Sequence, residues 1–499
     1  MDEAAPGRSQ DPGLAREAIG LREVFFQSVT HMAPAAAVAF SIIVGANFAS
    51  GALPLSVVFA LIGCLLVAIS IGQLAKHLPS AGGFYTYTSR GIHPAVGFLV
   101  AWGYAFVEPL VAPALYLIFG QVIAGTLQAE FGWSFSQWWW VAAIAAAVFV
   151  LYLGYYGIQV STRVGTILGV FEIAVFGALA IWLIVDAGGD NTLAVFGTKY
   201  ATVPGFEGIS GVIAGSVYTI LAFIGFEAAA PLAEETKDPR RTIGKAVILS
   251  CIGIGLFYIL TTYAAVVFFG PGRFFEFPAS GGGNPWDALA RAAWGAGWIL
   301  VFLAIANSAL ANANASSNAA TRTLFAMGRI RLLPAVLGRT NPTHRSPQVA
   351  VLFQFVIGVG VALWLGAQYN SPFTAFAMLG TIIGAVVIAI YMMVNLACLL
   401  YYAREHRNEF NLFLHGIVPI LGILAFVPAF LVAIGVGGSI FDFIAPLPYP
   451  FSVVGPVVGI WYLIGIVYLI YLTARKPQRL KDTGKVFIEE EVVEASAPI

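Results

Sequence analysis

The chain has 499 residues, of which 59% are hydrophobic and only 10% are charged, and its mean hydropathy is +0.86. Soluble domains carry about 25% charged residues, so this composition excludes an ordinary soluble protein and indicates a membrane protein. The formal net charge is zero, which argues against a nucleic-acid partner. The three cysteines lie in apolar segments and offer no disulfide framework.

Apolar stretches long enough to cross a bilayer recur along the chain. About 20 apolar residues are needed for one span, and the sequence on that basis predicts an all-α membrane protein with twelve transmembrane helices. The segment before them, residues 1–23, is polar and mixed in charge, which predicts a cytoplasmic tail and no secretory signal. The predicted spans lie near residues 25–49, 54–76, 95–126, 138–156, 162–186, 209–232, 244–269, 297–326, 347–366, 372–402, 415–437 and 453–473.

The positions of the basic residues test this count independently. Of the 25 Lys and Arg residues, only Lys199, Arg273 and Arg291 lie in the loops that twelve spans place on one side. All the others lie in the alternate loops and the two tails. By the positive-inside rule, both termini are therefore expected in the cytoplasm, and the protein is expected to be a multi-pass protein of the plasma (inner) membrane.

Two of the spans are interrupted by residues that a lipid-facing helix avoids. In the first, Pro34 follows a polar stretch at residues 27–31; in the sixth, Gly225 and Pro231 flank the ionisable Glu227. A single proline is most often a tolerated kink, but a buried carboxylate and freed backbone groups need partners that hydrocarbon does not supply. The interruptions lie about 190 residues and five spans apart. Because five is an odd number, a second repeat of five spans would have the opposite orientation in the membrane. Paired interruptions at matching places in two inverted repeats indicate a transporter's binding site.

Five short motifs resemble those of amino acid permeases of the amino acid–polyamine–organocation superfamily. They are residues 79–85 (PSAGGFY), 97–102 (GFLVAW), 225–227 (GFE), 234–241 (EETKDPRR) and 320–329 (ATRTLFAMGR). The resemblance implies a LeuT-like fold, in which two inverted five-helix repeats, with discontinuous helices 1 and 6, precede two further helices. It also implies alternating access around a site at the membrane midplane.

This resemblance divides the chain into five parts. They are a cytoplasmic N-terminal tail (1–23), the first five-helix repeat (24–190), the second, inverted repeat (205–403), helices 11 and 12 (412–474) and a cytoplasmic C-terminal tail (475–499).

The substrate site is expected at the two interruptions. Half-helix ends expose N–H and C=O groups, which can hold a carboxylate and an ammonium group without side chains. Phe223 and Phe226 either cover the ligand or simply pack, and Glu227 either senses substrate or protons or is a structural carboxylate satisfied by backbone groups. The predicted substrate-binding residues are Ala33, Pro34, Ala35, Ala36, Ala37, Phe223, Gly225, Phe226 and Glu227.

Glu172, inside the fifth span, is a candidate for ion coupling together with Glu227, because ionisable residues within a membrane span are functional candidates by default. The resemblance implies that Glu172 aligns with a lysine that substitutes for a sodium ion in proton-coupled relatives. Here the charge sign differs, so that mechanism does not transfer directly. Either Glu172 exchanges a proton, or it holds a cation such as sodium together with Ser316 or Ser317 and carbonyls of the first span. Protons are favoured over sodium.

Two further polar residues are possible lining groups of a cavity. Glu108 lies in the third span, and Asn314 lies in the eighth, which is unusually polar for a membrane helix. Each would either face a ligand or satisfy a polar group on a neighbouring helix. The six histidines show no paired spacing, and no hydrolase, metalloenzyme or phosphate-loop motif is present, so we expect no metal site, no cofactor and no enzymatic activity.

These features predict a secondary active transporter that carries amino acids or related amines by alternating access, with proton coupling favoured. Its partners would be a small-molecule substrate and the lipid bilayer. Within this class, the alternatives are an exchanger of amino acids or metabolites and a sodium-coupled carrier. In a different class, they are a membrane nutrient sensor that does not transport, and a channel. A sensor usually adds a soluble signalling domain and a channel needs a filter or a charged pore ring, and the sequence indicates neither.

Overall fold

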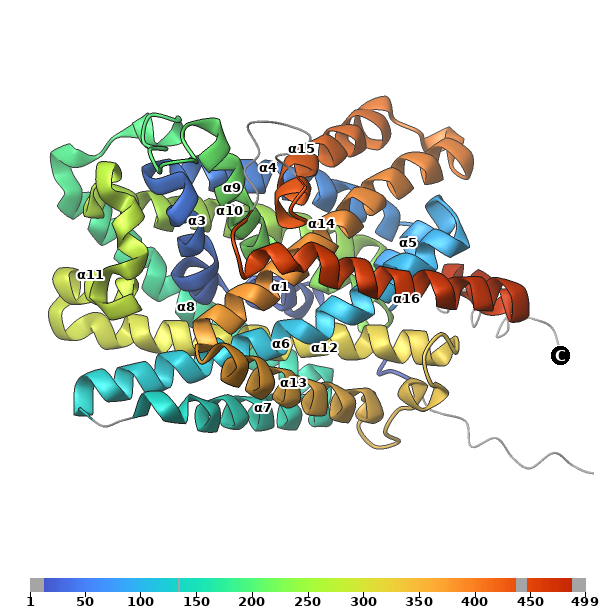
Figure 1. The fold of residues 1–499 in the computed structure, drawn as a ribbon. Coiled ribbons are helices and arrows are strands. Elements are labelled where there is room, and N and C mark those ends of the chain that lie inside the picture. The colour runs from blue at the N-terminus through green and yellow to red at the C-terminus, as the bar shows by residue number, and fades with distance from the viewer. Residues whose placement is uncertain (1–12, 133–134, 437–446, 487–499) are drawn as a thin grey trace, which may run out of the picture.

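The computed structural model describes residues 13–132, 135–436 and 447–486. Within these ranges the chain is helical and contains no strand, only an isolated bridge between Ile19 and Thr236. The prediction of an all-α protein is therefore confirmed. The long helices α6 (Pro94–Phe131), α12 (Trp298–Arg329) and α14 (Pro372–Arg404) pack together within one bundle (Figure 1).

In the first part of the chain, an interrupted helix is followed by several long helices. The elements of this part are α1 Leu21–His31, α2 Pro34–Ala36, η1 Ala37–Ile42, α3 Ile43–Ala49, η2 Ser50–Ala52, α4 Leu53–Ala75, α5 Phe84–Gly91, α6 Pro94–Phe131, η3 Phe135–Trp138, α7 Trp139–Tyr156, α8 Ile158–Ala187, η4 Gly188–Asp190 and η5 Leu193–Phe196.

The remaining elements begin with a second interrupted helix. They are α9 Ile209–Phe223, η6 Phe226–Glu235, α10 Pro239–Phe269, η7 Pro271–Gly283, α11 Pro285–Trp294, η8 Gly295–Gly297, α12 Trp298–Arg329, η9 Ala335–Gly338, α13 Gln348–Tyr369, α14 Pro372–Arg404, η10 Arg407–Glu409, η11 Leu412–Ile417, α15 Val418–Ala433, η13 Phe451–Val453, α16 Val454–Arg475, α17 Pro477–Lys481 and η14 Asp482–Gly484.

Eleven helical segments among the described residues are long and apolar enough to cross a membrane. The first, Leu21–Ala75, is 55 residues long and contains both of the first two predicted spans, because the short η2 joins α3 directly to α4. The other ten correspond one to one to the remaining predicted spans. The chain is thus a multi-pass membrane protein, and the number of crossings and the side on which each terminus lies stay predictions.

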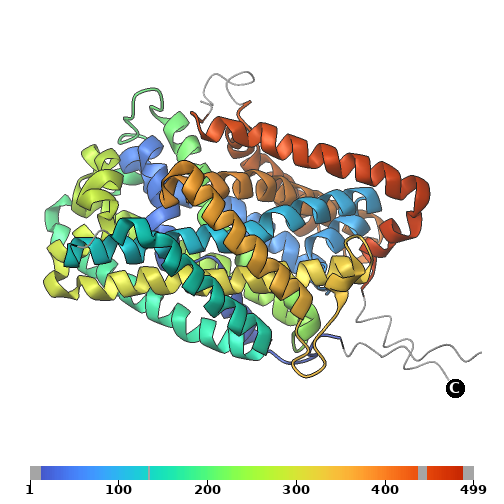
Figure 2. The ribbon, with the colours of Figure 1, turned by 60° about the horizontal axis from the view of Figure 1, so that its bottom comes forward.

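The buried centre and the apolar rim of the bundle follow from which helices pack together. Helix α6 packs against α12 and α14, and α4 packs against α10. In contrast, α7, α8, α13 and α16 carry many large apolar side chains that protein does not cover, such as Ile167, Trp364 and Leu463. Helices α7 and α13 lie along one edge of the bundle (Figure 1), and α16 (red) runs along another (Figure 2). These faces suit contact with lipid chains.

The two predicted tails lie partly outside the described residues, and both stay predictions. Residues 1–12 and 487–499 lie outside the described residues. Helical structure continues beyond α16 through α17 and η14, where the buried Thr483 shares a hydrogen bond of 2.6 Å with Ser89 of α5. Leu480, Thr483 and Val486, which lie within the predicted C-terminal tail, are therefore buried against the bundle.

Candidate functional site

The first helix is broken in the middle of the bundle. Helix α1 ends at His31, Ala33 takes a left-handed backbone conformation with φ of 48°, and helical structure resumes at Pro34. Proline suits the first position of a helix because that position needs no N–H donor. After three α-helical residues the chain forms a π-helical turn, Ala37–Ile42, and then α3. The break frees backbone groups at both half-helix ends.

Side chains from two other helices satisfy the N–H groups freed at this break. The Ala35 N–H donates a 3.0 Å hydrogen bond to Oε2 of Glu172 on α8, and the Ala36 N–H donates one of 3.0 Å to Oγ of Ser308 on α12. A carboxylate at the start of a helix is favourable because the exposed N–H groups carry partial positive charge. The predicted coupling residue Glu172 therefore lies directly at the first break.

The second break touches the first. Helix α9 ends at Phe223, Gly225 takes a φ of 121°, and a 3₁₀-helix follows at Phe226. A Cβ atom added at Gly225 would lie 2.7 Å from the carbonyl carbon of His31. Glycine is therefore needed at position 225 both for its backbone conformation and for the close approach of the two breaks.

The carboxyl group of Glu227 is held within the second break. Its Oε2 accepts a 3.0 Å hydrogen bond from the Gly225 N–H and one of 2.8 Å from the hydroxyl of Tyr391 on α14. Glu227 is fully buried. The backbone contact corresponds to the structural role weighed for this residue, and the tyrosine contact adds a link to a neighbouring helix.

Tyr258 of α10 joins the two breaks and was not singled out from the sequence. Its hydroxyl lies 2.5 Å from the carbonyl oxygen of Met32 and 2.9 Å from that of Ala222, so it donates to one of them at a time. Both carbonyls lie at the ends of interrupted helices. A tyrosine within an apolar span carries no pattern that would have marked it, because the contact depends on the tertiary fold.

A cavity lies beside the two breaks, and its empty space, which includes space open to solvent, is about 520 Å³. Its walls come from the first and sixth interrupted helices and from α6, α12 and α14. The lining residues are His31, Met32, Ala33, Ala36, Ala37, Phe40, Ser41, Val111, Ala114, Leu115, Ile118, Leu221, Ala222, Ile224, Asn312, Phe376, Gly380 and Ile383.

The structure divides the predicted substrate-binding residues into two groups. Ala33, Ala36 and Ala37 line the cavity, and on the sixth span the lining is formed by Leu221, Ala222 and Ile224. The other predicted residues do not line it and are buried behind its wall. These are Pro34, Ala35, Phe223, Gly225, Phe226 and Glu227.

The cavity wall is mostly apolar and holds a few polar groups without partners. Among the described lining residues, the polar side chains are those of His31, Ser41 and Asn312. The Oδ1 atom of Asn312 and both ring nitrogens of His31 are buried and have no hydrogen-bond partner within the described part of the chain. Unpaired buried polar groups are costly, so a ligand or water that bonded to them would be stabilised.

Glu108 lies one layer behind this wall. Its Oε1 is 3.5 Å from Nε2 of His31, close enough for an ion pair when the imidazole is protonated. The side chain is buried and does not line the cavity. Of the two roles weighed for Glu108, the contact with His31 corresponds to a buried partner for a polar residue on a neighbouring helix.

Asn314, Ser316 and Ser317 lie away from the cavity. Asn314 accepts a 2.8 Å hydrogen bond from the Ser161 hydroxyl, and with Ser317 it lines a second, smaller hollow. The Ser316 hydroxyl donates to a carbonyl of its own helix. Ser308 is the serine of α12 that lies against Glu172, and the eight residues from Ser308 to Ser316 correspond to about 12 Å along a helix. The structure therefore does not bring Ser316 or Ser317 to Glu172.

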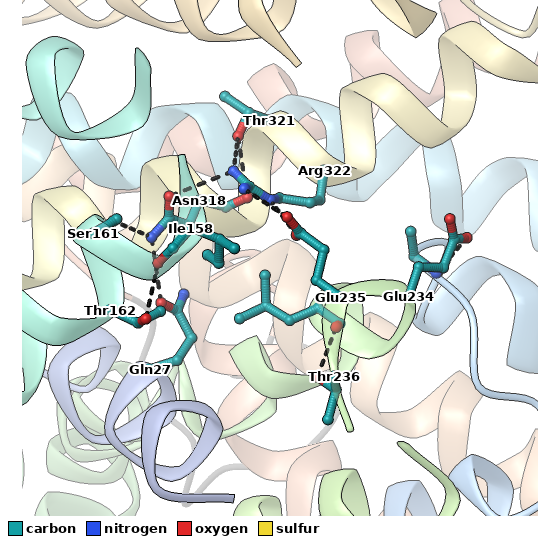
Figure 3. A network of polar contacts seen from close by, with 12 residues as sticks. Gln27, Ile158, Ser161, Thr162, Glu234, Glu235, Thr236, Asn318, Thr321 and Arg322 are labelled. Carbon is teal, nitrogen blue, oxygen red and sulfur yellow. Dashed lines mark hydrogen bonds and ion pairs between the residues drawn. The ribbon is translucent and has the colours of Figure 1, made fainter. Parts of the chain in front are cut away.

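A polar network links α1, α8, η6 and α12 between the cavity and the end of the bundle at which η6 ends (Figure 3). Asn318 donates to Oγ of Ser161 at 2.7 Å and to Oε1 of Gln27 at 3.4 Å. One turn further along α12, Arg322 forms an ion pair with Glu235, with Nε 2.9 Å from Oε2. Both side chains of this pair are only 1% exposed. The network therefore joins α1, α8, η6 and α12 through buried polar contacts.

Comparisons with known proteins agree with this architecture. The family model described as amino acid permease matches residues 23–479. The chain is 27% identical to the low-affinity putrescine importer PlaP of Escherichia coli K12 over 79% of this chain and 83% of the importer. It is 28% identical to the branched-chain amino acid permease BcaP of Bacillus subtilis over 62% of this chain and 66% of that permease. These proteins are transporters and not enzymes, and the chain belongs to the amino acid permease family.

Proposed function

We propose that the protein is a secondary active transporter that carries amino acids or related amines across the plasma membrane by alternating access. The observation that supports this most directly is the cavity beside the two helix breaks, which is lined by residues of both breaks and by His31 and Asn312 with their unpaired polar atoms. The names of the relatives, an importer of putrescine and a permease of branched-chain amino acids, support the substrate class.

Within this class, the lining favours an amino acid with an apolar side chain. Phe40, Val111, Ile118, Phe376 and Ile383 are among the apolar lining residues, and no carboxylate is among the described residues of the wall. A diamine would place a second ammonium group against these apolar side chains without an anionic partner, which is costly. An apolar side chain would instead displace water from this surface.

Asn312→Leu is expected to lower the uptake rate of substrate at concentrations below saturation at least about tenfold, as expected when a ligand loses a hydrogen bond in a dry site. The measurement is uptake and counterflow of labelled leucine, phenylalanine and putrescine by the purified protein in liposomes. Asn307→Leu is the matched control on the same helix, because Asn307 bonds to Leu168 and does not line the cavity. If putrescine were the one compound of the three to show counterflow, the substrate would be a diamine and not an apolar amino acid. Failure of every compound to show saturable counterflow would contradict the transport function.

Proton coupling is proposed to involve Glu172. The carboxyl group is fully buried, and no Lys, Arg or His of the described ranges forms an ion pair with it. An isolated buried carboxylate is costly, so such a group is stabilised by taking up a proton or a cation. Because Oε2 of Glu172 bonds to the Ala35 N–H, a change in its charge would act directly on the start of the second half of helix 1.

Glu172→Gln is expected to abolish the stimulation of uptake by an inward proton gradient while leaving counterflow measurable. The amide oxygen can still accept the bond from Ala35, but the side chain no longer exchanges a proton. The measurement is uptake by liposomes with an imposed pH gradient, an imposed sodium gradient or neither. Stimulation of the unaltered protein by sodium alone would overturn proton coupling. Absence of efflux unless external substrate is present would favour an obligate exchanger.

A further inference from the structure

The structure brings together three side chains at the protein surface that nothing in the transport cycle uses. His77 follows the end of α4, whereas His406 and Glu409 lie in the segment between α14 and η11. Nε2 of His77 is 3.0 Å from Oε2 of Glu409, and Nδ1 of His406 is 3.5 Å from Oε1 of the same carboxylate. The two imidazole rings stack with their centroids 4.0 Å apart. One carboxylate therefore faces two histidines from distant parts of the sequence.

The geometry of this cluster fits the ligand set of a divalent transition metal. One ligand atom from each residue can be chosen so that all three lie within 4.8 Å of one another. Nitrogen and oxygen ligands lie about 2.0–2.2 Å from zinc, which places neighbouring ligands of a tetrahedral ion about 3.4 Å apart. The distances of 3.0 Å and 3.5 Å from the two histidines to the two oxygens of Glu409 lie near that value. Two imidazoles and a carboxylate leave a fourth position for water, as in many zinc sites.

Neighbouring residues orient the ligands and leave them available. The second ring nitrogen of His406, Nε2, lies 3.0 Å from the hydroxyl of Tyr401; if it donates its proton there, Nδ1 presents a lone pair toward Glu409. His77, His406 and Glu409 are 22%, 29% and 51% exposed, so an ion can reach them from solvent. The pKa of the Glu409 carboxyl group lies below its ordinary value, chiefly because His77 hydrogen-bonds to it.

The other charged and titratable groups nearby are already engaged. Nδ1 of His415 accepts a hydrogen bond from the Asn411 N–H, and its Nε2 lies 3.3 Å from Oε1 of Gln73. The Lys76 ammonium donates to the same Gln73 oxygen at 2.7 Å. The described cysteines are all buried and do not compete for an ion at the surface. His415, Lys76 and the cysteines therefore do not belong to the cluster of His77, His406 and Glu409.

We propose that His77, His406 and Glu409 form a binding site for a zinc-class divalent ion that ties the end of α4 to the segment between α14 and η11. Imidazole and carboxylate ligands suit Zn²⁺, Ni²⁺ and Cu²⁺ better than Mg²⁺ or Ca²⁺. The ion would stabilise the folded arrangement of these two segments, because a ligand that binds only the folded protein raises its stability. This site does not depend on the substrate or on the coupling ion.

The test uses the full-length protein purified with an affinity tag that contains no histidine. Equilibrium dialysis with Zn²⁺ followed by metal analysis is expected to give one ion per chain, and Zn²⁺ is expected to raise the thermal midpoint. His77→Gln, His406→Gln and Glu409→Gln should each weaken binding at least about tenfold, as is usual when the ligand environment of a metal is lost. His93→Gln and His344→Gln should bind as the unaltered protein does, because these histidines lie outside the cluster.

Two further measurements separate a built site from incidental binding. Co²⁺ should give the intense visible absorption of a tetrahedral site in the unaltered protein and not in the His77→Gln/His406→Gln double variant. Binding should weaken at acidic pH, because metal ligands must be deprotonated to bind an ion. Equal binding of Zn²⁺ by the double variant and by the unaltered protein, or no binding by either, would overturn the proposal. A loss of transport activity alone would not bear on it.

Discussion

Gly225→Ile is expected to abolish substrate uptake while the protein still inserts into the membrane. At a φ of 121° any residue with a side chain is strained by roughly 1–3 kcal/mol. The added Cβ would also lie 2.7 Å from the His31 carbonyl carbon and 2.8 Å from Cγ of its ring, so the two helix breaks would have to separate. Separation of the breaks would displace Ile224 and His31, which both line the cavity.

The measurement for this variant is uptake in liposomes together with the amount of monodisperse protein in membranes. Gly225→Ala should retain a fraction of the uptake, because it adds the strained Cβ without the bulk of isoleucine. Gly253→Ile is the matched control, since a Cβ at Gly253 meets no atom within 4 Å. Normal uptake by Gly225→Ile would show that the contact between the breaks is not needed for transport.

Arg322→Met is expected to produce the largest loss of stability of any single change considered. It leaves the Glu235 carboxylate buried without its cationic partner, and breaking a buried pair in this way costs about 3–5 kcal/mol. The thermal midpoint of the purified protein should fall clearly. In Arg322→Met/Glu235→Leu much of the loss should be recovered, because replacement of both charges by apolar groups removes the unpaired charge.

The control for this pair is an ion pair at the surface. Arg90 and Glu405 lie 2.7 Å apart but are 41% and 36% exposed, so Arg90→Met should change stability by no more than about 1 kcal/mol. If Arg322→Met and Arg90→Met had similar midpoints, the buried pair would not hold η6 to α12. If the double variant remained as unstable as Arg322→Met, the contacts of Arg322 with Asn318 and Thr321 would carry the effect instead.

The positions of the helix breaks are the part of the site that sequence reasoning located best. Proline and glycine within apolar spans act through the local backbone, so Pro34 and Gly225 mark the breaks directly. Which neighbouring residues line the cavity cannot be read from the sequence in the same way. Which side of a break faces the ligand depends on how the half-helices turn, and the structure places Ile224 on the wall and Phe223 behind it.

Contacts between segments that are distant in the sequence could not be predicted from the spacing of residues along the chain. Glu172 was selected because it is charged within a span, yet its partner on α12 is Ser308 and neither Ser316 nor Ser317, since the register between two helices is set by their packing. The expectation of no metal site rested on the absence of paired histidines. His77 and His406 are far apart in sequence and come together only because α4 ends beside the segment that follows α14.

The shared hydroxyl of Tyr258 has a consequence for substrate binding in the proposed transport cycle. The hydroxyl has one proton and two possible acceptors, the carbonyl oxygens of Met32 and Ala222. If one oxygen bonds to another group, the hydroxyl can still donate to the other. An arriving ammonium group that took one oxygen would simply move the tyrosine's bond to the other. Binding and release of such a group would therefore exchange one hydrogen bond of the tyrosine for another.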